Sequence, residues 1–161
     1  TIYEGTTAIQ ANDLVGRKTA RDGGQLAKAV AAQIEQTEAE LQASGTADAQ
    51  AVARRLAAAR QAFLDAVDFM AANTKANPNA AFAGSVPYLM LAGNLVAGWQ
   101  MGRALLVAQQ LSSKGQDQAF MQAKIATARF YAEHILVKAP AQRDAIVEGA
   151  ASVTALALDA F

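Results

Sequence analysis

The sequence predicts an all-α protein, folded as an up-and-down helical bundle of about four long helices with flanking helices. Three observations support this fold class. Alanine is very abundant and proline occurs only 3 times, which favours helices because alanine loses no side-chain entropy in a helix and proline breaks one. Apolar residues recur at spacings of three and four, as on one face of a helix. No strand-length stretch alternates β-branched and polar residues, so no strand is predicted.

The first two expected helices are separated by Gly23 and Gly24, which end or break the first one. The first helix runs from about residue 8 to 20. The second runs from about residue 25 to 43, where apolar side chains at helical spacing would form one buried stripe. The members of that stripe are Leu26, Val30, Ile34, Thr37 and Leu41.

Asp48 is expected to cap a third helix that continues to about Asn73. Polar residues from 73 to 79, with Pro78 among them, predict a loop after it. The apolar stripe of this third helix consists of Val52, Leu56, Ala59, Phe63, Val67 and Met70.

A fourth helix is expected from about Pro87, which a first helical turn tolerates, to about Ser112. It is apolar nearly all round, so it should be the central helix of the bundle. Its large side chains are interpreted as core rather than as the lining of a ligand cavity; they are Tyr88, Met90, Trp99 and Met101. Three glycines would let neighbouring helices approach closely, at positions 93, 98 and 102.

A short link at residues 115–116 precedes a fifth helix, expected from about residue 117 to 137. Pro140 then marks a break, and a last helix is expected from about residue 142 to 160. The residues expected to be buried on this last helix include Ile146, Val153 and Leu156.

Composition excludes several classes of function. The 14 basic and 14 acidic residues cancel, so no nucleic-acid binding is expected. The absence of cysteine rules out disulfides and thiolate metal sites. The uncharged stretch from 76 to 102 contains asparagine and proline, which favours a buried helix over a membrane span. The single histidine, His134, lacks the Glu-x-x-His pairs of a di-metal bundle, so no metal site is expected. No signal peptide is visible, and a cytoplasmic location is expected.

The opening segment, residues 2–10, holds groups that could carry chemistry. The carboxylate of Glu4 precedes Gly5, whose bare backbone lets a ligand lie close. A helix start follows, and its N–H groups suit an anionic ligand. By themselves, these residues fit a solvated turn before a helix more simply.

The same segment, Ile2-Tyr3-Glu4-Gly5-Thr6 followed by Ile9-Gln10, resembles the one that holds the catalytic base in acyl-CoA dehydrogenases. The rest of the chain is similar to a subgroup with an additional C-terminal domain, which includes 3-methylmercaptopropionyl-CoA dehydrogenases. The runs that carry this second resemblance are Ala11-Asn12-Asp13-Leu14-Val15-Gly16-Arg17-Lys18, Gly98-Trp99-Gln100-Met101-Gly102-Arg103 and Ala128-Arg129-Phe130-Tyr131-Ala132-Glu133.

The resemblance implies that the full-length protein oxidises acyl-CoA to trans-2-enoyl-CoA and passes a hydride to FAD, with an electron-accepting flavoprotein as partner. Glu4 would be the base that removes the α-proton, and Gly5 would touch the substrate. The positions that contact FAD in the family are Thr6, Thr7 and Ala8. Ala8 replaces a polar side chain of relatives, so it would offer only a backbone contact.

The resemblance also implies two parts, with residues 1–22 ending the catalytic helical domain and residues 23–161 forming an additional C-terminal helical bundle. The family builds its flavin site mainly from other domains and a neighbouring subunit. The isolated chain is therefore expected to be inactive and not to retain FAD, and the full-length enzyme is expected to be a homo-oligomer. The alternative hypothesis is a non-enzymatic helical bundle that mediates assembly, with the Glu-Gly-Thr segment as a chance match.

Overall fold

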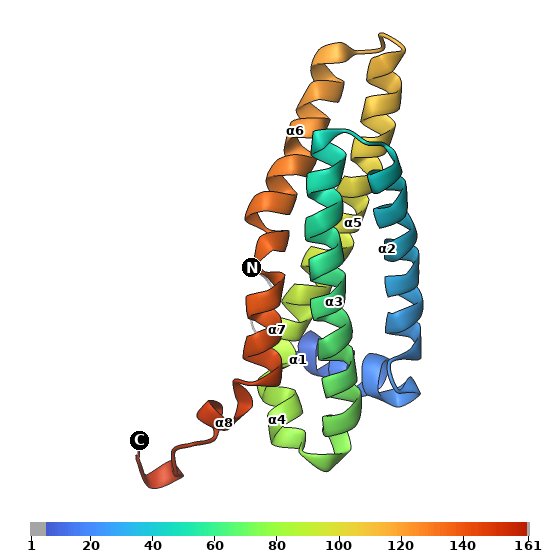
Figure 1. The fold of residues 1–161 in the computed structure, drawn as a ribbon. Helices are drawn as coiled ribbons and strands as arrows, with labels where there is room; N and C mark the ends of the chain where they lie inside the picture. Colours follow the sequence, from blue (N-terminus) through green and yellow to red (C-terminus); the bar gives the residue numbers. More distant parts are fainter. Residues whose placement is uncertain (1–5, 161) are drawn as a thin grey trace.

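The computed structural model describes residues 6–160 and confirms the all-α fold class, because every regular element among these residues is a helix (Figure 1). The α-helices are α1 (Thr6–Asp13), α2 (Gln25–Ala43), α3 (Ala47–Ala76), α4 (Pro78–Ala83), α5 (Ser85–Ser113), α6 (Gln118–His134), α7 (Ala139–Val147) and α8 (Ala150–Val153). The shorter elements are the π-helix η1 (Leu14–Thr19) and the 3-10 helices η2 (Ala20–Asp22), η3 (Leu136–Lys138) and η4 (Leu158–Ala160).

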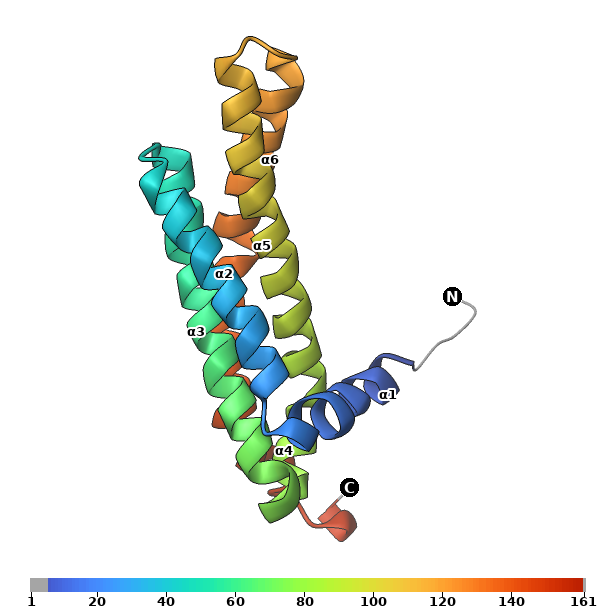
Figure 2. The same ribbon diagram turned by 90° about the vertical axis from the view of Figure 1, so that its right-hand side faces the viewer.

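The bundle is formed by α2, α3, α5 and α6, which run alternately up and down, as the sequence predicts (Figure 1). The column begun by α6 continues through η3 into α7 (Figure 1). Helix α3 packs against α2, α5, α6 and α7, and α5 packs against α1, α2, α3, α6 and α7. The turn between α5 and α6 extends beyond the turn between α2 and α3 (Figure 2).

The core is centred on the predicted stripe of α3, every member of which is buried. These side chains meet Leu91, Leu95 and Leu105 of α5 in one apolar cluster. Burying a side chain of this size contributes roughly 1.5–3 kcal/mol. Gly98 lets α5 approach η3 closely, because a Cβ at this position would lie only 2.6 Å from Leu136 Cδ1. The prediction of close packing at Gly98 is therefore confirmed.

Two of the sequence-based boundaries at prolines are wrong. The predicted loop 73–79 is largely helical, since α3 continues to Ala76 and α4 starts at Pro78. The side chain of Asn77 caps α4 by accepting a hydrogen bond from the Ala80 N–H at 3.3 Å. Pro140 likewise lies in the first turn of α7 and does not separate two helices. Proline has no N–H to lose in a first turn, so it starts a helix as readily as it ends one.

The last predicted helix, residues 142–160, is also wrong as a single element. Helix α7 ends at Val147, and two short helices, α8 and η4, follow it. Ile146 is buried as expected, but Val153 and Leu156 are exposed rather than buried. The segment after α7 leads away from the four long helices (Figure 1), and both side chains are more than 60% exposed.

The N-cap prediction for α3 is wrong by two residues. Thr46 is the cap, and its Oγ1 accepts a hydrogen bond from the Ala49 N–H at 3.2 Å. Asp48 lies instead in the first turn, where its carboxylate forms an ion pair of 2.9 Å with Arg129 of α6. The negative charge still favours this position, because the N-terminal end of a helix carries a partial positive charge.

Some residues expected in the core are exposed. Leu26 of α2 is 64% exposed and Met90 of α5 is 49% exposed, whereas Tyr88 is fully buried. Trp99 and Met101 are partly buried and pack against the core. Helix α5 therefore has many neighbours but keeps one open face. None of the helices within residues 6–160 combines the length and apolarity that crossing a membrane requires.

Candidate functional site

The three predicted FAD-contacting residues lie in the first turn of α1, while Glu4 and Gly5 lie outside the described residues. Thr6 is half-buried, and Thr7 and Ala8 are exposed. The first N–H groups of any helix have no acceptor within that helix. The first turn of a helix in general suits an anionic group, and the exposed Thr7 lies on the first turn of α1.

Helix α1 belongs to an arm, residues 6–22, that leaves the lower end of the bundle and projects to one side (Figure 2). Ala11 is fully buried, while Ile9 is 71% exposed, so only one face of α1 packs on the bundle. That face contacts α5. An ion pair of 3.0 Å between Asp13 and Arg17 links α1 to η1 along the arm. The arm therefore holds the start of α1 away from the four-helix core.

The arm is anchored by a buried hydrogen bond between Thr19 and Tyr88, whose hydroxyl oxygens lie 2.8 Å apart. The Tyr88 ring stacks on Phe63 of α3, with ring centres 5.8 Å apart and planes only 5° from parallel. Burial raises the pKa of Tyr88 to about 12, because the low-dielectric interior disfavours the phenolate. Tyr88 thus joins the arm, α5 and α3 as a neutral hydroxyl at physiological pH.

The turn at Gly23 and Gly24 fixes the angle between the arm and α2. Both residues have positive φ, 67° and 83°, which glycine adopts without steric cost. Asp22 secures the turn, since its two carboxylate oxygens accept hydrogen bonds of 2.9 Å from the N–H groups of Gly24 and Leu26. A Cβ at Gly24 would lie 2.5 Å from Val67 Cγ1. Any other residue type at position 24 would be strained by the positive φ and would force the Val67 side chain or the turn to shift.

Polar contacts inside the bundle are structural. Arg60 donates two hydrogen bonds to the buried carboxylate of Glu38, at 2.9 and 3.0 Å, and these bonds raise the pKa of the guanidinium. The indole N–H of Trp99 donates to Thr37 Oγ1 at 2.8 Å, which ties α5 to α2. In both pairs the buried polar group has a partner within the bundle. Thr37 and Trp99 also line a cleft of about 330 Å³ between α2 and α5.

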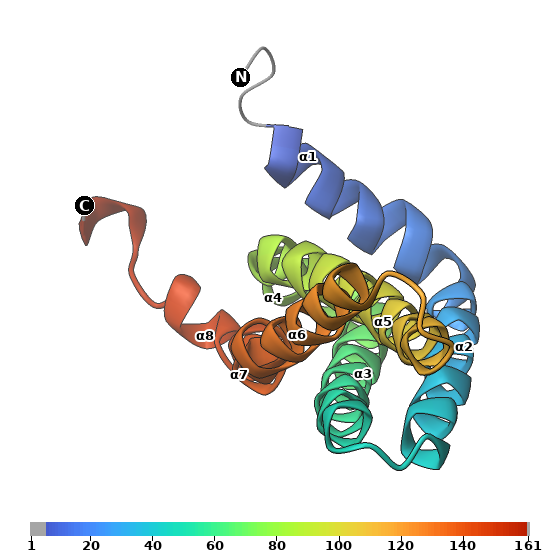
Figure 3. The ribbon, with the colours of Figure 1, turned by 90° about the horizontal axis from the view of Figure 1, so that it is seen from above.

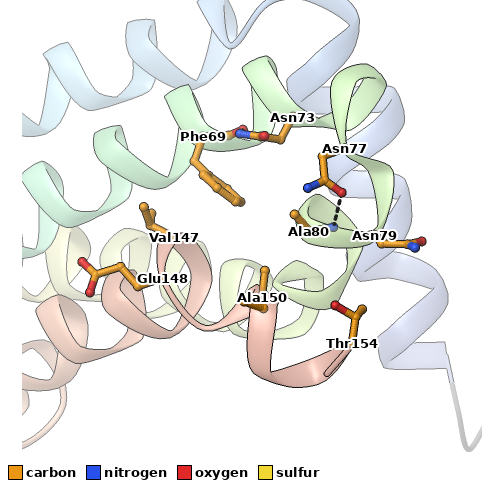
Figure 4. A pocket seen from close by; sticks show the side chains of 10 residues that line it. Phe69, Asn73, Asn77, Asn79, Ala80, Val147, Glu148, Ala150 and Thr154 are labelled. Atoms are coloured by element: carbon orange, nitrogen blue, oxygen red, sulfur yellow. Dashed lines mark hydrogen bonds between the residues drawn. The ribbon is translucent and has the colours of Figure 1, made fainter. Parts of the chain in front are cut away.

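A cavity of about 290 Å³ lies at the lower end of the bundle, between the end of α3, α4 and the α7–α8 segment (Figure 4). Two of its amide side chains serve local structure: Asn77 caps α4, as the dashed line in Figure 4 shows, and Asn73 donates to the Phe69 carbonyl at 2.9 Å. Glu148 at its edge forms an ion pair of 2.6 Å with Arg143. No acid–base pair is assembled here.

Residues 6–160 hold no group of three or more histidine, cysteine, aspartate or glutamate side chains that could bind a metal ion. His134 is exposed, and its ring stacks on Phe130 with centres 4.4 Å apart. The role predicted for the start of α1 stays a prediction, and the hydrogen bond that anchors the arm was not predicted. Thr19 and Tyr88 are 69 positions apart, and no local pattern links them.

Fold and arm together define an all-α bundle domain whose N-terminal arm carries the candidate site. The chain belongs to the acyl-CoA dehydrogenase C-terminal family: a family model described as "Acetyl-CoA dehydrogenase C-terminal like" matches residues 26–157. The chain is 52% identical over 147 residues to a 3-methylmercaptopropionyl-CoA dehydrogenase from Ruegeria pomeroyi, a match that covers 91% of this chain and 25% of that protein.

A second relative is the broad-specificity linear acyl-CoA dehydrogenase FadE5 from Mycobacterium tuberculosis, 32% identical over 160 residues. That match covers 90% of this chain and 25% of the relative. The chain therefore spans about a quarter of the length of the curated relatives that it matches. Its resemblance to the C-terminal region of acyl-CoA dehydrogenases is confirmed.

Proposed function

We propose that this chain is the C-terminal part of a flavin-dependent acyl-CoA dehydrogenase that converts acyl-CoA to trans-2-enoyl-CoA. The observation that carries the proposal is the 52% identity to a dehydrogenase over 91% of the chain. In the full-length enzyme, a cytoplasmic homo-oligomer, electrons leave for a second flavoprotein. The isolated bundle supplies no complete active site of its own.

The proposed division of the chain falls at the two-glycine turn. Residues 1–22 complete the catalytic helical domain, and residues 23–161 form the additional bundle. Two observations support this division. The family match begins at residue 26, the second residue of α2. The arm also turns away from α2 at Gly23 and Gly24, where the chain direction changes (Figure 2).

Glu4 is the proposed catalytic base. Its carboxylate accepts the α-proton of the acyl thioester as the Cα–H bond breaks, which requires the base to lie within hydrogen-bond reach of that carbon. FAD, when bound, supplies the acceptor for the hydride that leaves the β-carbon. Gly5 lets the substrate lie against the backbone, because it has no Cβ.

Thr6, Thr7 and Ala8 fit a role in holding FAD. They form the first turn of α1, with Thr7 and Ala8 exposed, and the start of a helix favours the negative charge of a pyrophosphate. Ala8 has no polar side-chain atom and contributes only its backbone. Three residues on one turn do not enclose a cofactor, so the isolated 161-residue chain is expected not to retain FAD.

The test is the Glu4→Gln variant of the full-length enzyme. Glutamine keeps the size of the side chain but cannot accept the proton, so turnover should fall at least 100-fold while bound FAD stays stoichiometric. Acyl-CoA-dependent bleaching of the flavin absorbance measures both quantities. A variant that keeps full turnover would remove the catalytic role of Glu4.

Two further measurements separate the enzyme from a bundle that only mediates assembly. The native reading frame should continue for several hundred codons upstream of Thr1 if the chain belongs to a dehydrogenase. The purified 161-residue chain should show no flavin absorbance. A reading frame that starts close to Thr1 would favour the assembly module, and a yellow chain with stoichiometric flavin would contradict the proposed division of the site.

A further inference from the structure

Among the described residues, the arm is the only segment that packs on one face of α5, and most of that face is open. In the view along the bundle, α3 lies on the opposite side of α5, α2 lies on one flank, and α6 and α7 lie on the other (Figure 3). Exposed residues follow the open face at spacings of three and four, which keeps them on one side of a helix. We call this set the α5 stripe; it consists of Val86, Met90, Gly93, Val96, Gln100, Arg103 and Val107.

The α5 stripe has the composition of a contact surface. Arg103 is its only charged member, and Met90 and Val96 are 49% and 43% exposed. A helix face that meets water normally carries polar side chains, and a contiguous exposed apolar patch marks an interaction site. Gly93 adds to this reading. A Cβ there would meet no atom within 4 Å, so the predicted close approach of a neighbouring helix does not occur within this domain.

Two apolar grooves adjoin the stripe and would accept side chains of a partner. One, of about 200 Å³, lies between η1, α2 and α5, where Leu14 and Val30 face Val96. The other, of about 450 Å³, lies between α5 and α6, where Phe120 and Met121 lie beside Val107. A partner that packs on α5 could therefore interlock with the domain on both sides of the stripe.

We propose that the α5 stripe is the surface on which the catalytic region of the same polypeptide packs. This rests on the proposed function, which places that region before Thr1. The arm supports it, because α1 lies on the open side of α5 (Figure 3). Length supports it too, since this chain corresponds to only 25% of its relatives. A region tethered through the arm reaches the stripe at a high effective concentration, which favours it over a second copy.

Methionine oxidation tests the proposal directly. Hydrogen peroxide converts an accessible methionine to its sulfoxide, and peptide mass spectrometry assigns the rate to each residue. Met90 should react at least tenfold more slowly in the full-length enzyme than in the 161-residue chain. Met70, which is fully buried in α3, should be protected in both and serves as the internal control. Equal rates at Met90 in the two proteins would overturn the proposal.

A pair of charged variants gives a second readout. Met90→Glu should leave the melting temperature of the 161-residue chain within a few degrees of the parent, because the side chain is half exposed there. In the full-length enzyme it should lower the melting temperature clearly. The matched control is Phe130→Glu, since Phe130 is exposed on α6 and off the stripe. A loss of stability equal to that of the control would overturn the proposal.

Dilution distinguishes a second copy from the tethered region. Protection of Met90 by the same polypeptide does not depend on protein concentration. Protection by a second copy disappears when dilution dissociates the oligomer. Loss of Met90 protection on dilution would therefore overturn the proposal. The catalytic assignment is tested separately. Glu4→Gln should lose turnover and keep Met90 protected, so a failure of the proposed base and a failure of the proposed docking surface give different results.

Discussion

Helices α3 and α5 have nearly the same length, 30 and 29 residues, but they differ in what surrounds them. Helix α3 has an apolar stripe, all of it buried, and none of its other large apolar side chains is exposed. Helix α5 is apolar nearly all round, yet one of its faces is open. The pattern of α3 is fully explained by packing within this domain, whereas the pattern of α5 exceeds what this domain buries. A bundle helix that is apolar on an exposed face can therefore indicate that another domain or protein packs on that face.

The sharpest test of this difference uses two adjacent residues of α5. Leu95 is 1% exposed and faces the core, while Val96 lies on the α5 stripe. Leu95→Ala should lower the free energy of unfolding of the 161-residue chain by about 2–5 kcal/mol, because it leaves a cavity. Val96→Ala should change it by no more than about 0.5 kcal/mol. Urea denaturation measures both, and similar losses would mean that the stripe is buried in the isolated chain.

A smaller effect is expected where α3, α5 and the arm meet. Tyr88→Phe removes the hydrogen bond to Thr19, and stranding a buried hydroxyl costs about 1–3 kcal/mol. The effect depends on pH because the pKa of Tyr88 is raised to about 12. Its neutral form stabilises the fold fully below the usual tyrosine pKa of about 10, and this contribution is lost as pH rises through the raised pKa.

The measurement is urea denaturation of both proteins between pH 8 and about pH 11.5, the range set by the usual and raised tyrosine pKa. The stability difference between the parent chain and Tyr88→Phe should shrink as pH rises. Thr19→Val is the companion variant, since it removes the other half of the same hydrogen bond and keeps the phenol. A difference that is constant with pH would show that Tyr88 does not titrate with the raised pKa.

The smallest effect concerns the start of α3. Thr46→Ala should cost about 1 kcal/mol, because it removes the side-chain acceptor for the Ala49 N–H. Asp48→Ala should cost less, about 0.2–1 kcal/mol, because it removes only a partly exposed ion pair with Arg129. Thermal unfolding of the two variants ranks them. A larger loss of stability for Asp48→Ala than for Thr46→Ala would support Asp48 as the N-cap, as the sequence predicts.

The fold could be predicted largely because its main signals are local. The bounds of α2, 25–43, match the structure, since glycines at both ends mark where the helix cannot continue. The buried stripe of α3 could also be predicted, because its apolar residues recur at helical spacing and so lie on one face. The errors at Pro78 and Pro140 also have a local cause. Proline is compatible with both the end and the first turn of a helix, so its position alone does not decide between them.

The candidate site could be predicted only in part. The start of α1 follows from the threonines before an apolar periodic segment, and the role of Glu4 follows from resemblance alone. The anchor of the arm could not be predicted, because Thr19 and Tyr88 meet only after three helices have packed. The exposure of Met90 was also beyond the sequence. Periodicity shows which apolar residues share one face of a helix, but it does not show which neighbouring element covers that face.

The two-glycine turn has a mechanical consequence. The 17 residues of the arm from Thr6 to Asp22 form a lever of roughly 25 Å at the rise of a helix. A rotation of about 10° at the turn would then displace Thr6 by about 4 Å at that rise, while proton transfer tolerates an error of only about 1 Å. Substituting Gly24, far from any reacting atom, would misalign the far end of the arm. The absence of a side chain at Gly24, where a Cβ would lie 2.5 Å from Val67 Cγ1, therefore helps to set the direction of the proposed catalytic segment.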